Sequence, residues 1–543
     1  MPSSFDPARL HELETTFDAD ANLVRSGERL WVAFSSLEYA ILLLRRDQAG
    51  DRQRAAAIIG AVLATQMHEP AWDRGRFPMS LPETWRDLNA NLFLAPEFVE
   101  IHSHWLPLLP DALAARFREA AIEAVQAVER RWADEVFDDH RDFKAYSNIF
   151  VLYIRALLLL GRCLGREQLR RDGEAQWQRW FNHVSSYGID EFCSPTYNEV
   201  VYEGLLGIRA ETASARMRAE VTMVLDHLSA LQHAVCHPLL RLGVVGTSRD
   251  YRLFVPPGGG AFRFLEHAGD ASYRPPTAVL EEFRQRRYPY RIAGRAGIVP
   301  FRFQSWQVRD AAMGSMTGGH YFPQQIHLMI AVGTSPMERA CAFFQADSSN
   351  PINGYVSQHD GRALCLFART PTSYRLTQLR EKADALPLPG TLPPCLGLTD
   401  GWDVRRHERG RVVMAAHGYA LHLATFALTG DRLEPAPLTP EKTATGEGNH
   451  VAGWRAASEV VWFACLAELL SDTAPPPDAT LNGHVGDRLV TLDESGGLAL
   501  RLARRPSGEL VQLYDADWRT LPLLESPTQS LWPGDLAAAS AAL

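Results

Sequence analysis

The spacing of apolar residues changes near residue 240, and this change constrains the fold more than any other feature of the chain. Before it, apolar residues recur every three to four positions and Pro and Gly are sparse, which is typical of amphipathic helices. After about residue 300, short or alternating apolar runs are separated by turn signals such as DGR and TGD, which is typical of strands. Helices followed by strands indicate segregated layers or separate domains rather than an alternating βαβ fold.

The first part of the chain predicts several successive helices. The clear ones cover residues 30–45, 54–66, 110–133, 148–164 and 210–236, with further candidates at 92–103 and 196–208. Helices joined by modest linkers suggest helical hairpins, which could form a bundle, a solenoid or an (α/α) toroid. The chain has no regular sequence repeat, and this weakens the solenoid alternative.

Composition and short motifs exclude several classes of protein. The chain carries 55 Lys+Arg against 64 Asp+Glu, and an acidic excess argues against general nucleic-acid binding. The most apolar run, residues 149–160, is shorter than the roughly 20 residues that span a bilayer. Seven scattered cysteines without a CxxC argue against a disulfide framework or a structural zinc site. The start of the chain does not resemble a signal peptide, so we expect a cytoplasmic protein with no membrane or nucleic-acid partner. The oligomeric state stays open.

Three histidines near a predicted helix end are candidate metal ligands. His233 and His237 are four residues apart and could share a helix face, with His227 six residues earlier. Pro238 follows at once and no carboxylate partner is evident, so ordinary helix-end histidines are favoured.

Residues 71–93 (AWDRGRFPMSLPETWRDLNANLF) concentrate tryptophan and polar side chains in a loop that leads to a helix. Flat indole faces stack on the CH groups of sugars, and polar side chains fix sugar hydroxyls, so the composition fits carbohydrate binding. On composition alone a structural role is favoured, with Asp87 as the helix cap and the tryptophans in the core.

Two later segments place polar groups at the start of a helix. In KAYSNIF, Ser147 or Asn148 can cap the following helix; alternatively, the Asn148 amide points into a cavity and donates to a carboxylate or carbonyl oxygen. In DEFCSPTYNEVVYEGLLGI, Pro195 suits a helix start, which puts Tyr197 and Asn198 in the first turn. Polar groups in such positions often line a site at the mouth of a helical barrel.

The segment GVVGTSRDYRLF, residues 243–254, introduces a locally basic region. From Arg241 to Arg309 the chain has twelve arginines, no lysine and fewer acidic residues. Because a guanidinium group can bind a carboxylate through two parallel hydrogen bonds, this stretch is suited to anion recognition. Surface arginines that pair with the acidic helical half explain it equally well.

Taken in order, these segments resemble helical-barrel proteins related to polysaccharide lyases. The similarity lies in DLNA, in SNI before an apolar helix with LLLLG, in EFCSPTY and in SRDY, while FPM stands where FPW is expected. The stretch RDAAMGSMTGGHYFPQQ resembles the first sheet strands of the second domain of such proteins. The resemblance implies an α+β multidomain fold, with an (α/α) toroid or incomplete helical barrel over residues 1–290. An antiparallel β-sandwich domain follows over residues 291–543.

The resemblance also implies an enzyme that cleaves a glycosidic bond next to a uronic acid by β-elimination, on a uronate-containing oligo- or polysaccharide and without a cofactor or metal. Asn148 is the predicted neutraliser of the uronate carboxylate, Tyr197 with Arg249 the predicted base and acid, and Tyr251 the alternative. A tyrosine with its ordinary pKa near 10 is a poor base, and a nearby arginine would lower that pKa. The predicted substrate-binding residues are Trp72, Arg76, Asn89, Asn198, His104 and His320. Either of these two histidines could supply the base instead.

Two other functions stay open at this point. A glycoside hydrolase on the same kind of barrel needs two carboxylates, about 5 Å apart for retention or about 6.5–9.5 Å apart for inversion. The candidates are Asp73, Glu83, Glu191 and Glu199. A non-catalytic carbohydrate-binding protein would instead present aromatic side chains without a Tyr–Arg cluster or a carboxylate pair.

Overall fold

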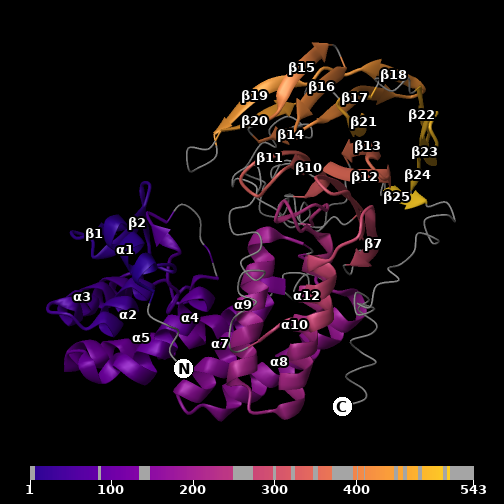
Figure 1. Ribbon diagram of the computed structural model, residues 1–543. Coiled ribbons are helices and arrows are strands. Elements are labelled where there is room, and N and C mark those ends of the chain that lie inside the picture. Colours follow the sequence, from indigo (N-terminus) through magenta and orange to yellow (C-terminus); the bar gives the residue numbers. More distant parts are fainter. Residues whose placement is uncertain are drawn as a thin grey trace. The chain divides into compact units, whose positions relative to one another are not determined.

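In the computed structural model the chain begins with helices and continues into antiparallel sheets (Figure 1). The structure describes residues 6–83, 87, 89–133, 147–191, 193–248, 273–296, 301–318, 325–345, 352–369, 395–399, 401–408, 410–444, 450–455, 462–474, 480–504 and 510–513. The predicted order of an α+β multidomain fold, helices first and antiparallel sheets second, is confirmed. Closure of the helices into a ring stays a prediction.

The helices are α1 (Pro7–Thr16), α2 (Ser36–Arg46), α3 (Asp51–Ala64), α4 (Ala90–Glu100), α5 (Asp111–Ala133), α7 (Ser147–Cys163), α8 (Glu167–Tyr187), α9 (Pro195–Glu211), α10 (Ala215–Val235) and α12 (Thr277–Arg284). A π-helical turn, η1 (Ile101–Trp105), and a 3₁₀ turn, η2 (Leu106–Leu108), continue α4. The α1 helix and the short sheet of β1 (Phe17–Asp18), β2 (Leu23–Ser26), β3 (Arg29–Trp31) and β4 (Ser80–Leu81) were not predicted. Residues 30 and 31, expected to begin a helix, instead belong to β3.

Contacts divide the chain into two units. Unit 1 contains Met1–Phe181 and Gly204–Ala219, and unit 2 contains Asn182–Glu203 and Glu220–Leu543. The boundary between the two units therefore falls within α8, α9 and α10. The last described helix before the large sheets is α12 and the first strand of those sheets is β7 (Tyr290–Ala296), so the change from helix to strand occurs near residue 290.

In unit 1, α7 and α8 approach closely at two glycines. A Cβ on Gly161 would lie 2.8 Å from the backbone nitrogen of Arg170, and a Cβ on Gly173 would lie 3.0 Å from Leu158. The inner face of α8 presents Trp177, Trp180 and Phe181, all buried. The missing side chains of the two glycines therefore let the backbones pack at short range.

In unit 2, two large antiparallel sheets form a sandwich. One has the strand order β19-β20-β14-β11-β10-β9-β8-β7 and the other β12-β13-β21-β17-β16-β15, with β18 beside β17. Buried side chains from both sheets, including Leu328, Ile330, Ala363 and Leu421, form one apolar core. The strands of the first sheet are β7, β8 (Phe301–Gln307), β9 (Ala311–Gly318), β10 (Ile326–Gly333), β11 (Arg339–Gln345), β14 (Cys395–Leu398), β19 (Thr439–Ala444) and β20 (His450–Arg455).

The strands of the second sheet are β12 (Ile352–His359), β13 (Arg362–Arg369), β15 (Asp403–Glu408), β16 (Arg411–Ala416), β17 (Tyr419–Thr429), β18 (Arg432–Pro435) and β21 (Trp462–Ser471). A further sheet contains β22 (Leu481–Val485), β23 (Leu489–Glu494), β24 (Ala499–Arg504) and β25 (Leu510–Leu513). A two-stranded ribbon, β5 (Cys236–His237) with β6 (Leu242–Gly243), follows α10. In β8 every second side chain is buried, as expected for a strand with one face on the core.

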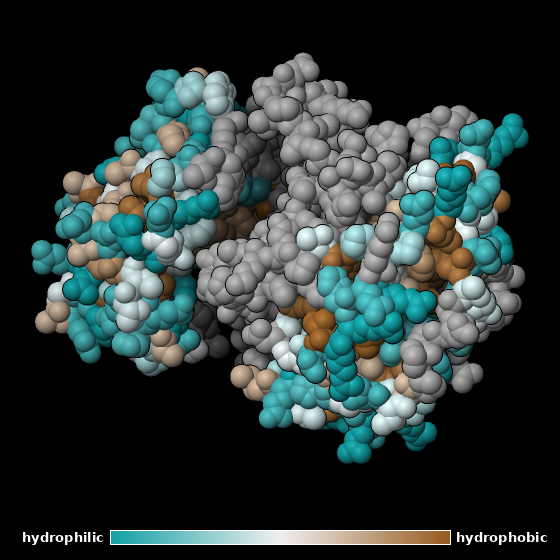
Figure 2. Space-filling model, turned by 90° about the horizontal axis from the view of Figure 1, so that it is seen from above, coloured by the Kyte–Doolittle hydropathy of each residue, from teal (hydrophilic) through white to brown (hydrophobic). Residues whose placement is uncertain are grey.

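On the face seen in Figure 2, hydrophilic residues cover most of the described surface, and the apolar ones lie in small groups. Scattered apolar residues of this kind are ordinary for a folded protein. Within the described ranges, no helix combines the length and the apolarity needed to cross a membrane.

One buried carboxyl group stands out in unit 1. Glu97 lies in α4, which packs against α7, and its Oε2 is shielded from solvent with no hydrogen-bond partner among the described residues. Burial raises the pKa of Glu97 to about 7, while the Arg155 guanidinium opposes the rise. The protonated form is therefore the one that the folded state favours.

We predict that replacing Glu97 by Gln removes a pH dependence of stability. The folded pKa lies above the unfolded one, so this group stabilises the fold at low pH, and the contribution is lost as the pH rises through about 7. Between pH 4.5 and 7 the loss amounts to about 3 kcal/mol. Urea unfolding at several pH values measures it: E97Q should fall less steeply than wild type, and parallel curves would contradict the account.

Candidate active site

The start of α9 is a capped helix end that places Tyr197 in the first turn. The Tyr197 backbone N–H donates to the Ser194 Oγ at 3.2 Å, which makes Ser194 the N-cap, and Pro195 occupies the first helical position. Tyr197 is partly exposed. The sequence prediction of a helix start at this motif is confirmed, and the tyrosine lies on a fixed backbone.

A tight turn precedes this helix. Cys193 has φ of 48°, in the left-handed region that residues other than Gly rarely adopt, and its side chain is buried. The Ser194 N–H donates to the Glu191 carbonyl at 3.4 Å across the turn. Backbone in such a conformation persists only where its surroundings hold it in place.

Asn198 helps to hold the turn. Oriented to satisfy its neighbours, its amide NH₂ donates to the Glu191 carbonyl at 3.1 Å, and its Oδ1 accepts from the Gln232 amide of α10 and from the Cys193 and Ser194 backbone N–H groups. Asn198 is only 2% exposed. This geometry favours a positioning role over the substrate contact that we expected from the sequence.

Asp190 connects this turn to two other parts of unit 2. Its carboxylate contacts the His183 Nε2 of α8, and both side chains are buried. Its backbone carbonyl accepts from the Ser248 hydroxyl at 2.6 Å, also in a buried environment. The first residues of the GTSRDY motif therefore lie against the DEFCSPTY motif. Arg249 and Tyr251, which follow directly, lie outside the described residues, as does His320.

A second tyrosine, which the sequence did not single out, is bonded deep in unit 2. The Tyr273 hydroxyl donates to the Asp226 carboxylate of α10 at 2.7 Å. Burial, together with the adjacent carboxylate, raises the pKa of Tyr273 well above its usual range. This phenol therefore stays protonated and is unsuited to act as a base.

His233, in the last turn of α10, and His237, in the following strand β5, are bonded to the backbone. The His233 Nδ1 contacts the Ser229 carbonyl at 2.7 Å and the His237 Nε2 contacts the Val308 carbonyl at 2.7 Å. Burial lowers the pKa of each to about 4, so both are neutral at pH 7. These bonds fit the helix-end role favoured by the sequence.

Two predicted site residues of unit 1 lie on separate elements. Asn148 is in the first turn of α7 and is 1% exposed. His104 is exposed on the π-helical turn η1. A fully buried amide reaches a ligand only from within a cavity, whereas His104 faces solvent.

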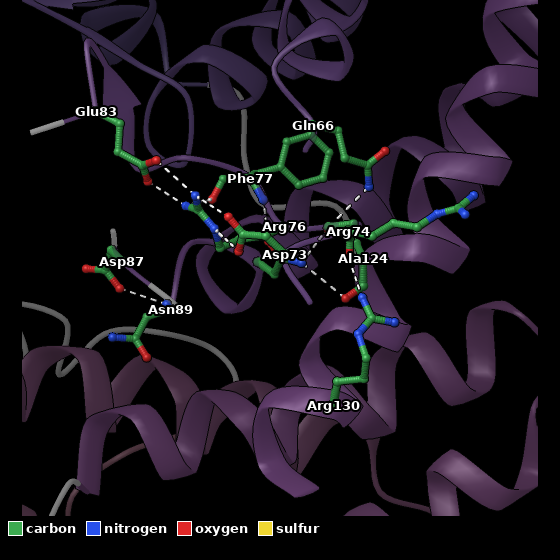
Figure 3. Close-up of polar contacts among 12 residues, drawn as sticks. Gln66, Asp73, Arg74, Arg76, Phe77, Glu83, Asp87, Asn89, Ala124 and Arg130 are labelled. Atoms are coloured by element: carbon green, nitrogen blue, oxygen red, sulfur yellow. Dashed lines mark hydrogen bonds and ion pairs between the residues drawn. The ribbon is translucent and has the colours of Figure 1, made fainter. Parts of the chain in front are cut away.

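In the 71–93 segment, Arg76 is at the centre of a buried ion-pair network (Figure 3). Its Nε donates to the Asp73 Oδ1 at 2.6 Å, its Nη1 to the Glu83 Oε1 at 2.5 Å and to the Phe77 carbonyl at 3.3 Å, and its Nη2 to both carboxylates at 2.9 Å. Burial would lower the Arg76 pKa, but the bonds to Glu83 and Asp73 raise it above its ordinary value. All three nitrogens are thus occupied, which favours a structural role over the predicted substrate contact.

The turn next to Arg76 is linked to α5 by the side-chain hydrogen bonds of Asn91 and Gln66. The Asn91 amide donates to the Gly75 and Ala124 carbonyls and accepts from the Phe77 N–H, and the Gln66 amide donates to the Gly75 and Ala120 carbonyls. Gly75 has φ of 84°, and a Cβ there would lie 2.1 Å from the Glu123 carbonyl oxygen. These contacts hold the backbone at Gly75 and Phe77 against α5.

Trp72 and Asn89 are the other predicted substrate-binding residues of this segment. Trp72 is 60% exposed, which contradicts the expectation that the tryptophans lie in the core, and Trp85 lies outside the described residues. Asn89, not Asp87, is at the N-cap position of α4, and Asp87 instead accepts from the Asn89 backbone N–H at 2.7 Å. An exposed indole on a rigid loop is suited to stacking on a ligand.

The candidate carboxylates of a glycoside hydrolase do not form a pair that flanks an open space among the described residues. Asp73 and Glu83 share the Arg76 guanidinium, so they form an ion-pair network rather than a pair that flanks an open space. Glu191 is fully buried, and Glu199 is partly buried on α9. The geometry gives the paired-carboxylate mechanism no specific support.

One family model matches part of the chain. Residues 7–246 match a family described as a domain of unknown function (DUF8769), which is less than half of the chain. A comparison with curated protein sequences found no match. The matched stretch includes the helices α1–α10 and ends two residues before Ser248.

Among solved structures, the chain is similar to the chondroitin AC lyase of Streptomyces coelicolor A3, determined in complex with chondroitin sulphate. The identity is 11%, the alignment covers 92% of this chain and 86% of that chain, and the TM-score is 0.40. At this degree of similarity, the description of the fold rests on the chain's own helices and sheets.

We predict that Arg76→Met destabilises the protein strongly. The buried Asp73 carboxylate and the partly exposed Glu83 carboxylate would lose their shared cation, and removing one partner of a buried ion pair costs about 3–5 kcal/mol. The matched control is Arg74→Met, because the Arg74 side chain is 60% exposed in its ion pair with Glu123 and such pairs contribute at most about 1 kcal/mol. Urea unfolding measures both; equal small losses would contradict the structural role of Arg76.

Proposed function

We propose that the protein is a lyase that cleaves a glycosidic bond next to a uronic acid by β-elimination. The observation that carries this proposal is the buried hydrogen bond from the Ser248 hydroxyl to the Asp190 carbonyl. It joins the segment that leads to Arg249 to the turn that leads to Tyr197. A tyrosine base requires a guanidinium group nearby, and we propose Arg249 for this role because the bonded segment leads to it.

The reaction assigns three tasks to side chains. The uronate carboxylate is neutralised, which makes the neighbouring C5–H acidic; a base removes that proton; and an acid protonates the leaving oxygen at C4. Tyr197 takes the proton and returns it to the leaving oxygen, and Tyr251 is the alternative for this role. Asn148 stabilises the developing negative charge through its amide NH₂.

The chemistry of tyrosine explains why an arginine is part of the proposal. A phenol with its ordinary pKa near 10 is almost entirely protonated at neutral pH. A guanidinium nearby favours the phenolate and lowers that pKa. Arg249 is the proposed source of this charge, and the position of Tyr197 in the first turn of α9 adds the positive end of the helix dipole.

Trp72 and Asn89 are proposed substrate contacts, with His104 and His320 as further ones. The exposure of Trp72, on a loop that the Arg76 network holds rigid, supports sugar stacking. Arg76 and Asn198 enter the proposal as supports for the loops rather than as ligands. The proposed substrate is a uronate-containing oligo- or polysaccharide, and we retain the expectation of a cytoplasmic location.

The first experiment is product analysis on a panel of uronate-containing oligosaccharides that includes chondroitin sulphate. Elimination predicts a product with a ring double bond, seen as ultraviolet absorbance, and no incorporation of ¹⁸O from labelled water. Cleavage with ¹⁸O incorporation and without the chromophore would replace the lyase by a glycoside hydrolase. Binding of the panel without any cleavage would favour the non-catalytic alternative.

The second experiment removes the hydroxyl of Tyr197. On a substrate that the panel identifies, Tyr197→Phe should lower kcat by at least about 10²-fold, because the general base and acid are lost together, while the ligand Kd stays within about twofold. Tyr419→Phe is the matched control, since this tyrosine of β17 bonds Asp310 within the sandwich. Wild-type turnover by Y197F would remove Tyr197 from the mechanism.

A further inference from the structure

The contact between His183 and Asp190 is the most completely buried histidine–carboxylate pair among the described residues. The side chain of His183 is 0% exposed and that of Asp190 is 3% exposed. The Nδ1 of His183 is also shielded and has no hydrogen-bond partner among the described residues. The contact between Nε2 and the Asp190 carboxylate is therefore the polar interaction that orients this imidazole among the described residues.

The pair belongs to a continuous set of hydrogen bonds. Asp190 accepts from Ser248 through its carbonyl, and the next residue, Glu191, accepts from the Asn198 amide through its own carbonyl. Asn198 directly follows Tyr197 and also accepts from Gln232. Four segments are therefore fixed to one turn: α8, the start of α9, α10 and the residues before Arg249.

The buried turn needs partners that hold its conformation. Residues 190–194 contain a left-handed Cys193 and a series of buried polar groups, which stay in one conformation only if their partners hold them. The Asp190 side chain is buried in this place, and the His183 imidazole contacts its carboxyl group from α8. The Tyr187 ring, 5.2 Å from the His183 ring, covers the imidazole from the next turn of α8.

From this geometry we propose that His183 and Asp190 are positioning residues for Tyr197: the pair sets the place of the phenol in the proposed elimination without contacting the substrate. This inference rests on the proposed function. A catalytic group displaced by about 1 Å can lose up to about 10²-fold in rate, whereas ground-state binding by other residues is little affected. A positioning pair thus acts on kcat more than on KM.

The test compares three single variants on the full chain, below the temperature at which any of them begins to unfold. His183→Phe keeps a ring but loses the donor, His183→Gln keeps an N–H donor, and Ser185→Ala is the control. Ser185 is a buried residue of the same helix whose Oγ bonds no described residue. We expect H183F to lower kcat by about 10- to 100-fold with KM within twofold, H183Q to recover part of the loss, and S185A to match wild type. Wild-type kcat in H183F, or a loss that falls on KM alone, would overturn the proposal.

If H183F does not fold, the double variant His183→Phe with Asp190→Leu removes the pair without leaving a buried charge behind. A low kcat in the folded double variant supports the proposal, and a wild-type kcat overturns it. A readout without substrate separates this inference from the proposed function. With fluorotyrosine at position 197, the ¹⁹F resonance should shift in H183F and stay in place in S185A. An unchanged resonance overturns the inference, whereas a wild-type enzyme that forms no unsaturated product overturns the proposed function.

Discussion

The hydrogen bond between the Ser248 hydroxyl and the Asp190 carbonyl is the interaction on which the candidate site depends. It joins two segments that are 58 residues apart in the chain, and it does so where both are buried. A buried carbonyl that loses its donor is costly, so the two segments stay together. His183 from α8 and Gln232 from α10 also contact this turn and its neighbour Asn198. The backbone at Tyr197 is therefore held in place.

In residues 71–93 and 190–208, the described polar side chains mainly bind groups of their own loops. Arg76 is occupied by Asp73 and Glu83, and Asn198 by the backbone of its own turn. Buried polar groups need hydrogen-bond partners. Where an irregular loop packs against a helix, many polar side chains therefore bond the loop itself. What the loops leave exposed is then informative: Trp72 in one region, and the partly exposed Tyr197 in the other.

The periodicity of apolar residues was sufficient to predict most of the helices of the first part and the strands of the second. It missed α8, although Trp177, Trp180, Phe181 and Val184 have helical spacing, because polar residues and Gly173 fill the first half of that helix. It also assigned residues 30 and 31 to a helix, where pairing with β2 and β4 determines the local structure.

For the site, the residue types of Pro195 and Thr196 predicted the helix start but not what its side chains do. The pairing of Arg76 with Asp73 and Glu83 depends on a loop conformation that includes Gly75 at positive φ, and local sequence does not specify it. The partnership of His183 with Asp190 depends on how α8 meets the turn, a tertiary contact. Arg249, Tyr251 and His320 stay predictions, since they lie outside the described residues.

The most direct test of the central claim is a kinetic isotope effect at the carbon that loses its proton. A uronate substrate with deuterium at C5 should be cleaved more slowly than the protium form in a single turnover, because elimination breaks the C5–H bond. This difference should accompany the rise in ultraviolet absorbance. Equal rates for the two substrates, with cleavage products that lack the double bond, would contradict the account.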